Sequence, residues 1–128
     1  MKLRDEWEDD TPYGVHKGWL RKGTIFKIRD KKVILSVQAS ETHHSTPREN
    51  WLKLSDCSEV EIALVNANYT EEQPGEKYFF LPSDLGIAGF DKYFSYDIGA
   101  YVPLGVVESL ADELAKLGTI VNDKEVRA

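Results

Sequence analysis

The chain has 128 residues, of which 41% are apolar and 30% charged, a balance typical of one globular domain. It contains no run of about 18 apolar residues, so no transmembrane helix is expected, and it begins without the apolar stretch of a secretory signal. Cys57 is the only cysteine, which excludes an intrachain disulfide and favours a reducing, cytoplasmic location. We therefore expect a single cytoplasmic domain over residues 1–128.

The formal net charge is −6, with sixteen basic residues scattered among twenty-two acidic ones. Stable binding of DNA or RNA needs a clustered basic face, and the densest basic stretch, residues 16–22, is short. Stable nucleic-acid binding is therefore not expected. One small nucleotide in a local positive pocket, or a basic partner protein, stays compatible with this composition.

Residues 1–23 are predicted to form an irregular N-terminal arm with three aromatic anchors, Trp7, Tyr13 and Trp19. Acidic residues and the turn chemistry of Thr11-Pro12-Tyr13-Gly14 argue against regular structure. Docking of the arm on its own core is the favoured interpretation. Capping of a ligand site or of a neighbouring subunit is the alternative.

Two apolar runs at residues 24–29 and 33–39, joined by a turn at 30–32, predict a β-hairpin. In the second run one face is apolar and is expected to face the core: Val33, Leu35, Val37 and Ala39. The other face becomes polar toward its end, which fits a face opening onto solvent or a ligand: Ile34, Ser36, Gln38 and Ser40.

The rest of a β-rich core over residues 24–102 is less regular. Residues 41–58 form a long connection, a kind that is often functional, with Trp51, Leu52 and Leu54 as its apolar anchors. Further strands are predicted at 59–66, 77–81 and 98–102, and a short helix around Asp91–Phe94 within the loop 83–98.

Residues 103–118 predict the C-terminal helix. Pro103 suits the first helical position, an apolar stripe follows at three- and four-residue spacing, and Gly118 is expected to end the helix as a left-handed cap. The stripe consists of Val106, Val107, Leu110, Leu114 and Leu117. We therefore predict an α+β fold, a small antiparallel sheet of four to five strands with this helix packed on one face.

The polar end of the second strand leads into the candidate binding segment, His43-His44-Ser45-Thr46-Pro47-Arg48. The guanidinium of Arg48 offers five donors suited to phosphate or carboxylate, although a structural salt bridge is an open alternative. Adjacent histidines on an extended backbone point to opposite faces, and no further ligand sits at a zinc-like spacing, so no metal site is expected. No nucleophile elbow and no phosphate loop is present.

Two further candidate features come from the rest of the chain. Cys57 lies between Asp56 and Ser58, and the nearby negative charge disfavours a reactive thiolate. Aromatic rings beside an arginine can stack a base, and the ring-bearing residues most expected to be exposed are Tyr93, Phe94 and Tyr96.

The chain resembles a family of small, uncharacterised phage and prophage proteins over residues 33–118. The resemblance rests on Leu35-Ser36-Val37-Gln38-Ala39-Ser40, His43, Thr46-Pro47-Arg48, the strand around Val60-Glu61-Ile62, and Gly99-Ala100-Tyr101-Val102-Pro103. This chain has His44 where that pattern has an aromatic residue. The order of sheet and helix is similar to phage anti-defence proteins, among them sponges of the anti-Thoeris and anti-CBASS kind that sequester cyclic nucleotides.

The leading functional hypothesis is a non-enzymatic anti-defence protein that sequesters a small anionic, cyclic nucleotide. Arg48 would hold phosphate, one of Tyr93, Phe94 or Tyr96 would stack the base, and the remaining binding residues would be Gln38, His43, His44, Ser45 and Thr46. We expect no cofactor and no catalytic residue. We do expect the protein to form a homo-oligomer. The alternatives are an acidic inhibitor that contacts a host defence or nucleic-acid enzyme and, third, a nucleotide hydrolase.

Overall fold

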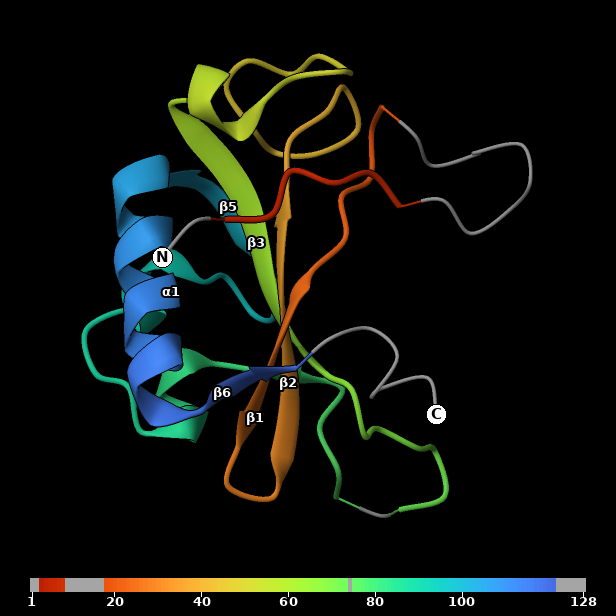
Figure 1. Cartoon of the computed structure of the whole chain (residues 1–128), viewed down its shortest axis with the longest axis vertical. Helices are drawn as coiled ribbons and strands as arrows, with labels where there is room; N and C mark the ends of the chain where they lie inside the picture. The colour runs from red at the N-terminus through yellow and green to blue at the C-terminus, as the bar shows by residue number, and fades with distance from the viewer. Residues whose placement is uncertain (1–2, 9–17, 74, 122–128) are drawn as a thin grey trace.

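The structure is a computed structural model that describes residues 3–8, 18–73 and 75–121. One antiparallel sheet runs through it in the order β4-β3-β2-β1-β6, and β5 pairs with β3 beside that path. The strands are β1 (Thr24–Ile28), β2 (Lys31–Gln38), β3 (Glu59–Asn66), β4 (Phe79–Phe80), β5 (Gly99–Pro103) and β6 (Thr119–Val121). One α-helix, α1 (Leu104–Leu117), lies along one face of this sheet (Figure 1). The predicted α+β fold is confirmed, with six strands rather than four to five.

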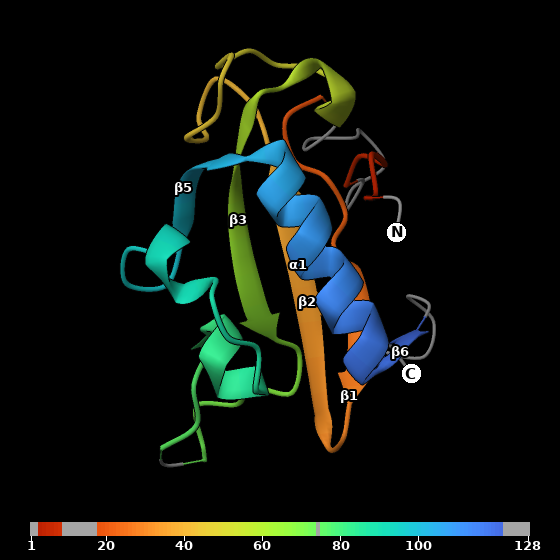
Figure 2. The same ribbon diagram turned by 90° about the vertical axis from the view of Figure 1, so that its left-hand side faces the viewer.

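The core lies between α1 and the sheet face that the sequence pattern predicts. Val33, Leu35, Val37 and Ala39 of the β2 region are all buried, and β3 contributes Val60, Ile62 and Leu64. From the helix, the buried residues are Val107, Leu110, Ala111 and Leu114. Figure 2 shows α1 running in front of β2 and toward β1, so the helix covers the middle of the sheet. The predicted stripe is right except at its end, where Leu117 is 43% exposed.

Several boundaries differ from the prediction. The β1–β2 turn is tighter, because Lys31 and Lys32 pair with Ile28 and Lys27 instead of forming a turn. The strand predicted at 77–81 is reduced to the two residues of β4. Short 3₁₀ helices occupy Leu54–Asp56, Pro82–Leu85 and Asp91–Tyr93, and the last of these is the short helix predicted around Asp91–Phe94.

Helix α1 ends at Gly118 as predicted, but this glycine is not the predicted left-handed cap. Gly118 is extended, at φ −149° and ψ −170°. A Cβ at this position would lie 2.2 Å from the carbonyl oxygen of Lys27, so a glycine is needed for close backbone approach. The chain then enters β6, which pairs with β1 and which the sequence analysis does not predict.

The N-terminal arm docks on the core of its own chain, as favoured, within residues 3–8 and 18–23. Arg21 exchanges backbone hydrogen bonds with the Gln38 side chain at the end of β2, and Leu3 packs against the core. Tyr13 lies outside the described residues. No helix in the described part of the chain is long and apolar enough to cross a membrane.

Candidate functional site

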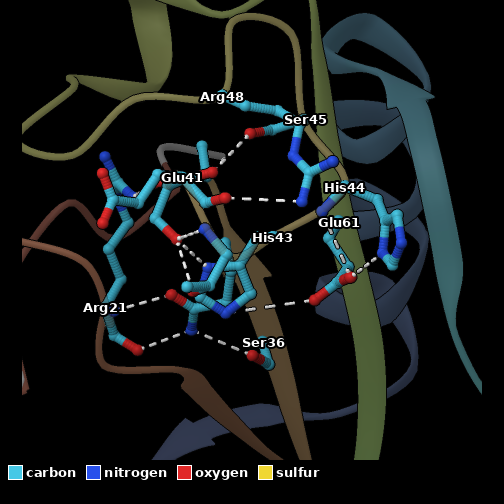
Figure 3. Close-up of polar contacts among 12 residues, drawn as sticks. Arg21, Ser36, Glu41, His43, His44, Ser45, Arg48 and Glu61 are labelled. Atoms are coloured by element: carbon cyan, nitrogen blue, oxygen red, sulfur yellow. Dashed lines mark hydrogen bonds and ion pairs between the residues drawn. The ribbon is translucent and has the colours of Figure 1, made fainter.

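The segment after β2 folds back over the end of the sheet and is held by its own side chains. The Ser40 hydroxyl lies 2.6 Å from Nδ1 of His43. The Ser45 hydroxyl donates to the carbonyl oxygen of Pro47 at 2.9 Å. Figure 3 shows His43 and Ser45 where β2 ends, beside β3. The segment is therefore a rigid platform, and a rigid platform loses little conformational entropy when a ligand binds.

Both histidines converge on one carboxylate, that of Glu61 on β3. His44 Nδ1 lies 2.7 Å from Glu61 Oε1, and His43 Nε2 lies 4.0 Å from Glu61 Oε2. The expectation that the neighbours point to opposite faces fails because the backbone is not extended here: the N–H of His43 donates to the carbonyl of Ser40, and that of Ser45 to His43. Figure 3 shows Glu61 between the two rings.

His43 is the more enclosed of the two histidines. Its ring stacks on Trp19 with centroids 6.3 Å apart, which places the N-terminal arm over it. Burial lowers the pKa of His43 below its ordinary value of 6.5, Arg21 and His44 lower it further, and Glu61 acts in the opposite direction. His43 is thus a positioning residue rather than a donor open to solvent.

His44 meets an aromatic ring from β5 that the sequence analysis does not include among the site residues. The rings of His44 and Tyr101 are edge-to-face at 5.6 Å, and the Tyr101 N–H donates to the carbonyl of His44 at 3.0 Å. Tyr101 has a φ of 53°, and the β3–β5 register shifts between Val60 and Ile62. A register shift of this kind, a β-bulge, changes the direction in which nearby side chains point. The sequence of β5 contains no pattern that would predict it.

Arg48 is exposed at the outer edge of the segment. Its Nη2 donates to the carbonyl oxygen of Glu41 at 3.3 Å. Within the described residues Arg48 makes no ion pair, so the structural salt bridge considered above is not found there. The guanidinium keeps most of its donors free for an anion, and Figure 3 shows it on the same segment as His44.

Two predicted binding residues are enclosed by the protein itself. Gln38 is 5% exposed, and its amide bonds the backbone N–H and carbonyl of Arg21. Ser45 is 1% exposed and donates to backbone carbonyls. The polar face of β2 was expected to open onto solvent or a ligand, but the arm covers its end because Arg21 completes the hydrogen bonds of Gln38. Neither side chain is open to a ligand.

The remaining predicted binding residues lie in two regions, Thr46 in the candidate segment and the three aromatic residues at 93–96. Thr46 is exposed, and its hydroxyl donates to the Glu59 carboxylate at 2.8 Å, which ties the segment to β3. Tyr93 and Phe94 are half-buried and pack against the core. Tyr96 is 93% exposed. Among the described residues no ring contact or hydrogen bond joins these three aromatic residues to residues 43–48.

Ser40, His43 and Glu61 are the residue types of a catalytic triad, but their arrangement is structural. Ser40 is 0% exposed, and its Oγ also accepts the N–H of Thr42 at 3.1 Å. A nucleophile must reach its substrate, and this hydroxyl cannot. Cys57 is buried, and burial raises the pKa of its thiol, which agrees with an unreactive cysteine.

In the described residues no three histidine, cysteine, aspartate or glutamate side chains are grouped to hold a metal ion. Comparisons of the chain with protein-family models, with curated proteins and with solved structures find no match. The resemblance to phage and prophage proteins therefore stays a prediction.

Proposed function

We propose that this protein is a non-enzymatic binding protein that captures a small anionic nucleotide at the exposed surface formed by Arg48, His44 and Tyr101. In this arrangement Arg48 binds phosphate, and the Tyr101 ring, with His44 at its side, gives the base an apolar surface. Tyr101 takes the stacking role first given to Tyr93, Phe94 or Tyr96. The anti-defence setting and the phage or prophage origin stay predictions.

The observation that supports this proposal most is that the Arg48 guanidinium is exposed and has few partners. An exposed arginine with one hydrogen bond to a carbonyl and no described ion pair retains the planar donor fork that suits phosphate. Two carboxylates of β3 beside this segment are engaged by other side chains, Glu61 by His44 and Glu59 by Thr46. Arg48 is therefore the cationic group that this segment offers to an anion.

The burial of the candidate nucleophiles in and beside this segment supports capture rather than turnover. Ser40, Ser45 and Cys57 are all buried, and sequestration needs no catalytic base. A nucleotide hydrolase would need a reacting group open to its substrate. Conversion of a bound nucleotide into a product of different mass would revive that third hypothesis.

A thermal-shift screen with linear and cyclic nucleotides tests the proposal. A nucleotide at about 100 times its dissociation constant should add about 2.7 kcal/mol to the unfolding free energy, a shift of several degrees. Arg48→Ala should lose the shift and Arg48→Lys should lose most of it, since lysine lacks the fork. Lys27→Ala, which removes an exposed cation from β1, should keep it. A shift that survives in Arg48→Ala overturns the proposed role of Arg48.

A second candidate function, inhibition by protein contact, is favoured by Tyr96. This ring is 93% exposed at the tip of a hairpin closed by Ser95 and Ile98, with a φ of 60°. An exposed tyrosine in a strained backbone is the kind of residue that anchors a protein interface. The net charge of −6 suits a basic partner, and such a complex should weaken steeply with salt.

A further inference from the structure

A groove separate from the Arg48 surface opens beside the first turns of α1. It has a volume of about 930 Å³ and lies between the N-terminal segment at residues 3–7, the segment 51–55 and the helix residues Leu104 and Glu108. Small-molecule sites commonly have volumes of about 300–1,000 Å³ and apolar walls with a few polar groups. None of the residues of the Arg48 surface lines it.

Trp51 forms a fixed aromatic wall of this groove. Trp51 is 64% exposed, and its backbone N–H donates to the carbonyl of Gly18 at 2.6 Å. A Cβ on Gly18 would lie 2.4 Å from the indole, so the ring rests directly on the glycine backbone. From the sequence, Trp51 is predicted to be an apolar anchor. The structure instead turns its ring outward, at a φ of 64°.

Trp7 forms the adjoining wall and is tied to the core from behind. The two indoles meet edge-to-face, with centroids 5.8 Å apart. The guanidinium of Arg21 lies 4.5 Å from the centre of the Trp7 ring. Arg21 is 2% exposed and pairs with Asp5 at 2.8 Å. The aromatic corner is therefore already formed before any ligand arrives.

Two features of the groove favour a cation, the carboxylate of Glu108 and the exposed indole of Trp51. The groove lining holds two carboxylates, Asp5 and Glu108, against one ammonium, Lys53. Asp5 is bound to Arg21, whereas the exposed side chains of Glu108 and Lys53 have no partner among the described residues. Indole faces attract cations. The net charge of −6 also attracts cations to the protein.

We propose that this groove is a second binding site, for an amine with a flat aromatic body. The ring of the ligand stacks on Trp51, its apolar edge contacts Leu52 and Leu104, and its ammonium group faces the carboxylate of Glu108. This inference does not depend on the proposed nucleotide function, because the two sites share no residue.

Phenethylamine and phenylacetate are suitable probes, because they carry the same ring and opposite charges. Each is titrated into the full-length protein while tryptophan emission is followed with excitation at a wavelength that phenyl rings do not absorb. Phenethylamine should bind at least about fivefold more tightly than phenylacetate, as expected for one surface charge pair and ring contact. Glu108→Gln should reduce this preference to the part that the ring contact supplies, and Trp51→Ala should weaken phenethylamine binding about tenfold.

Two controls keep the test decisive. Arg48→Ala should leave phenethylamine affinity unchanged, which separates this site from the nucleotide surface. Trp51→Phe retains a ring and should keep most of the affinity if Trp51→Ala fails to fold. No binding of phenethylamine to the wild-type protein, equal binding of the two probes, or unchanged binding in a folded Trp51→Ala variant overturns the proposal.

Discussion

His44 Nδ1 lies 2.7 Å from Glu61 Oε1, and this contact ties the polar segment to the strand that crosses the middle of the fold. The hydrogen bond fixes how the imidazole faces Tyr101, because a ring nitrogen bound to a carboxylate sets the orientation of the ring. The segment that carries Arg48 is thereby positioned by the sheet rather than by loop contacts alone. Stability measurements can therefore report on the site before any ligand is known.

Stability should fall in mildly acidic solution because of His43. Its pKa is lowered in the folded state, mainly by burial, so the unfolded chain binds more protons as the pH falls. The unfolding free energy should be unaffected well above pH 6.5, decrease as the pH falls below 6.5, and level off below the folded pKa. Urea unfolding between pH 8 and about pH 5 measures this slope. His43→Gln should show a smaller slope, and an equal slope in both proteins contradicts the assignment.

Removing Arg21 should be among the most destabilising single changes. Its side chain donates to the carbonyls of Ala39 and Leu52 and to the carboxylate of Asp5. Arg21→Met should lower the unfolding free energy by about 3 kcal/mol, because it leaves buried acceptors and a carboxylate without their partner. Arg48→Met, at an exposed site, should change it by less than about 0.5 kcal/mol. Similar denaturation midpoints for the two variants argue against a structural role for Arg21.

Two glycines at opposite ends of α1 should respond oppositely to alanine. Gly118→Ala places a Cβ 2.2 Å from the Lys27 carbonyl oxygen, which forces backbone movement at the α1–β6 junction and should cost about 2 kcal/mol. Gly105→Ala meets no atom within 4 Å and should stabilise the helix by up to about 1 kcal/mol. Thermal unfolding of both variants gives the comparison. A stabilised Gly118→Ala would falsify the close approach described here.

Tyr96→Gly should stabilise the isolated protein by about 1 kcal/mol, because glycine accepts a φ of 60° without steric cost. Tyr96→Ala keeps the strained backbone and should leave stability nearly unchanged. Chemical unfolding of the three proteins separates the effects. A clear loss of stability in Tyr96→Gly means that the ring contributes to folding and weakens the case for it as a contact residue.

The strands and helix with regular apolar spacing follow from the sequence, because period-two and three-to-four spacing directly encode which face is buried. Val60, Ile62 and Leu64 on β3, and Leu110 and Leu114 on α1, are buried as predicted. By contrast, β6 is only three residues long, too short for a recognisable pattern. It forms because Gly118 lets the chain pass close to β1.

The site was harder to predict because its members are joined by tertiary contacts. Arg21 looks like part of a surface basic stretch, yet it is buried and satisfies Gln38. That a polar segment follows β2 was predictable, since the strand pattern ends in clustered polar residues. The partners that orient it, Glu61 and Tyr101, depend on strand pairing and a bulge that local sequence does not specify.

Heteronuclear NMR of the labelled protein, titrated with the nucleotide that gives the largest thermal shift, tests the central claim most directly. Our account predicts that the signals that move most belong to Arg48, including its side-chain N–H groups, together with His44 and Tyr101. Shifts confined to Trp51 and Glu108, or no shifts at saturating nucleotide, would contradict nucleotide capture at the Arg48 surface.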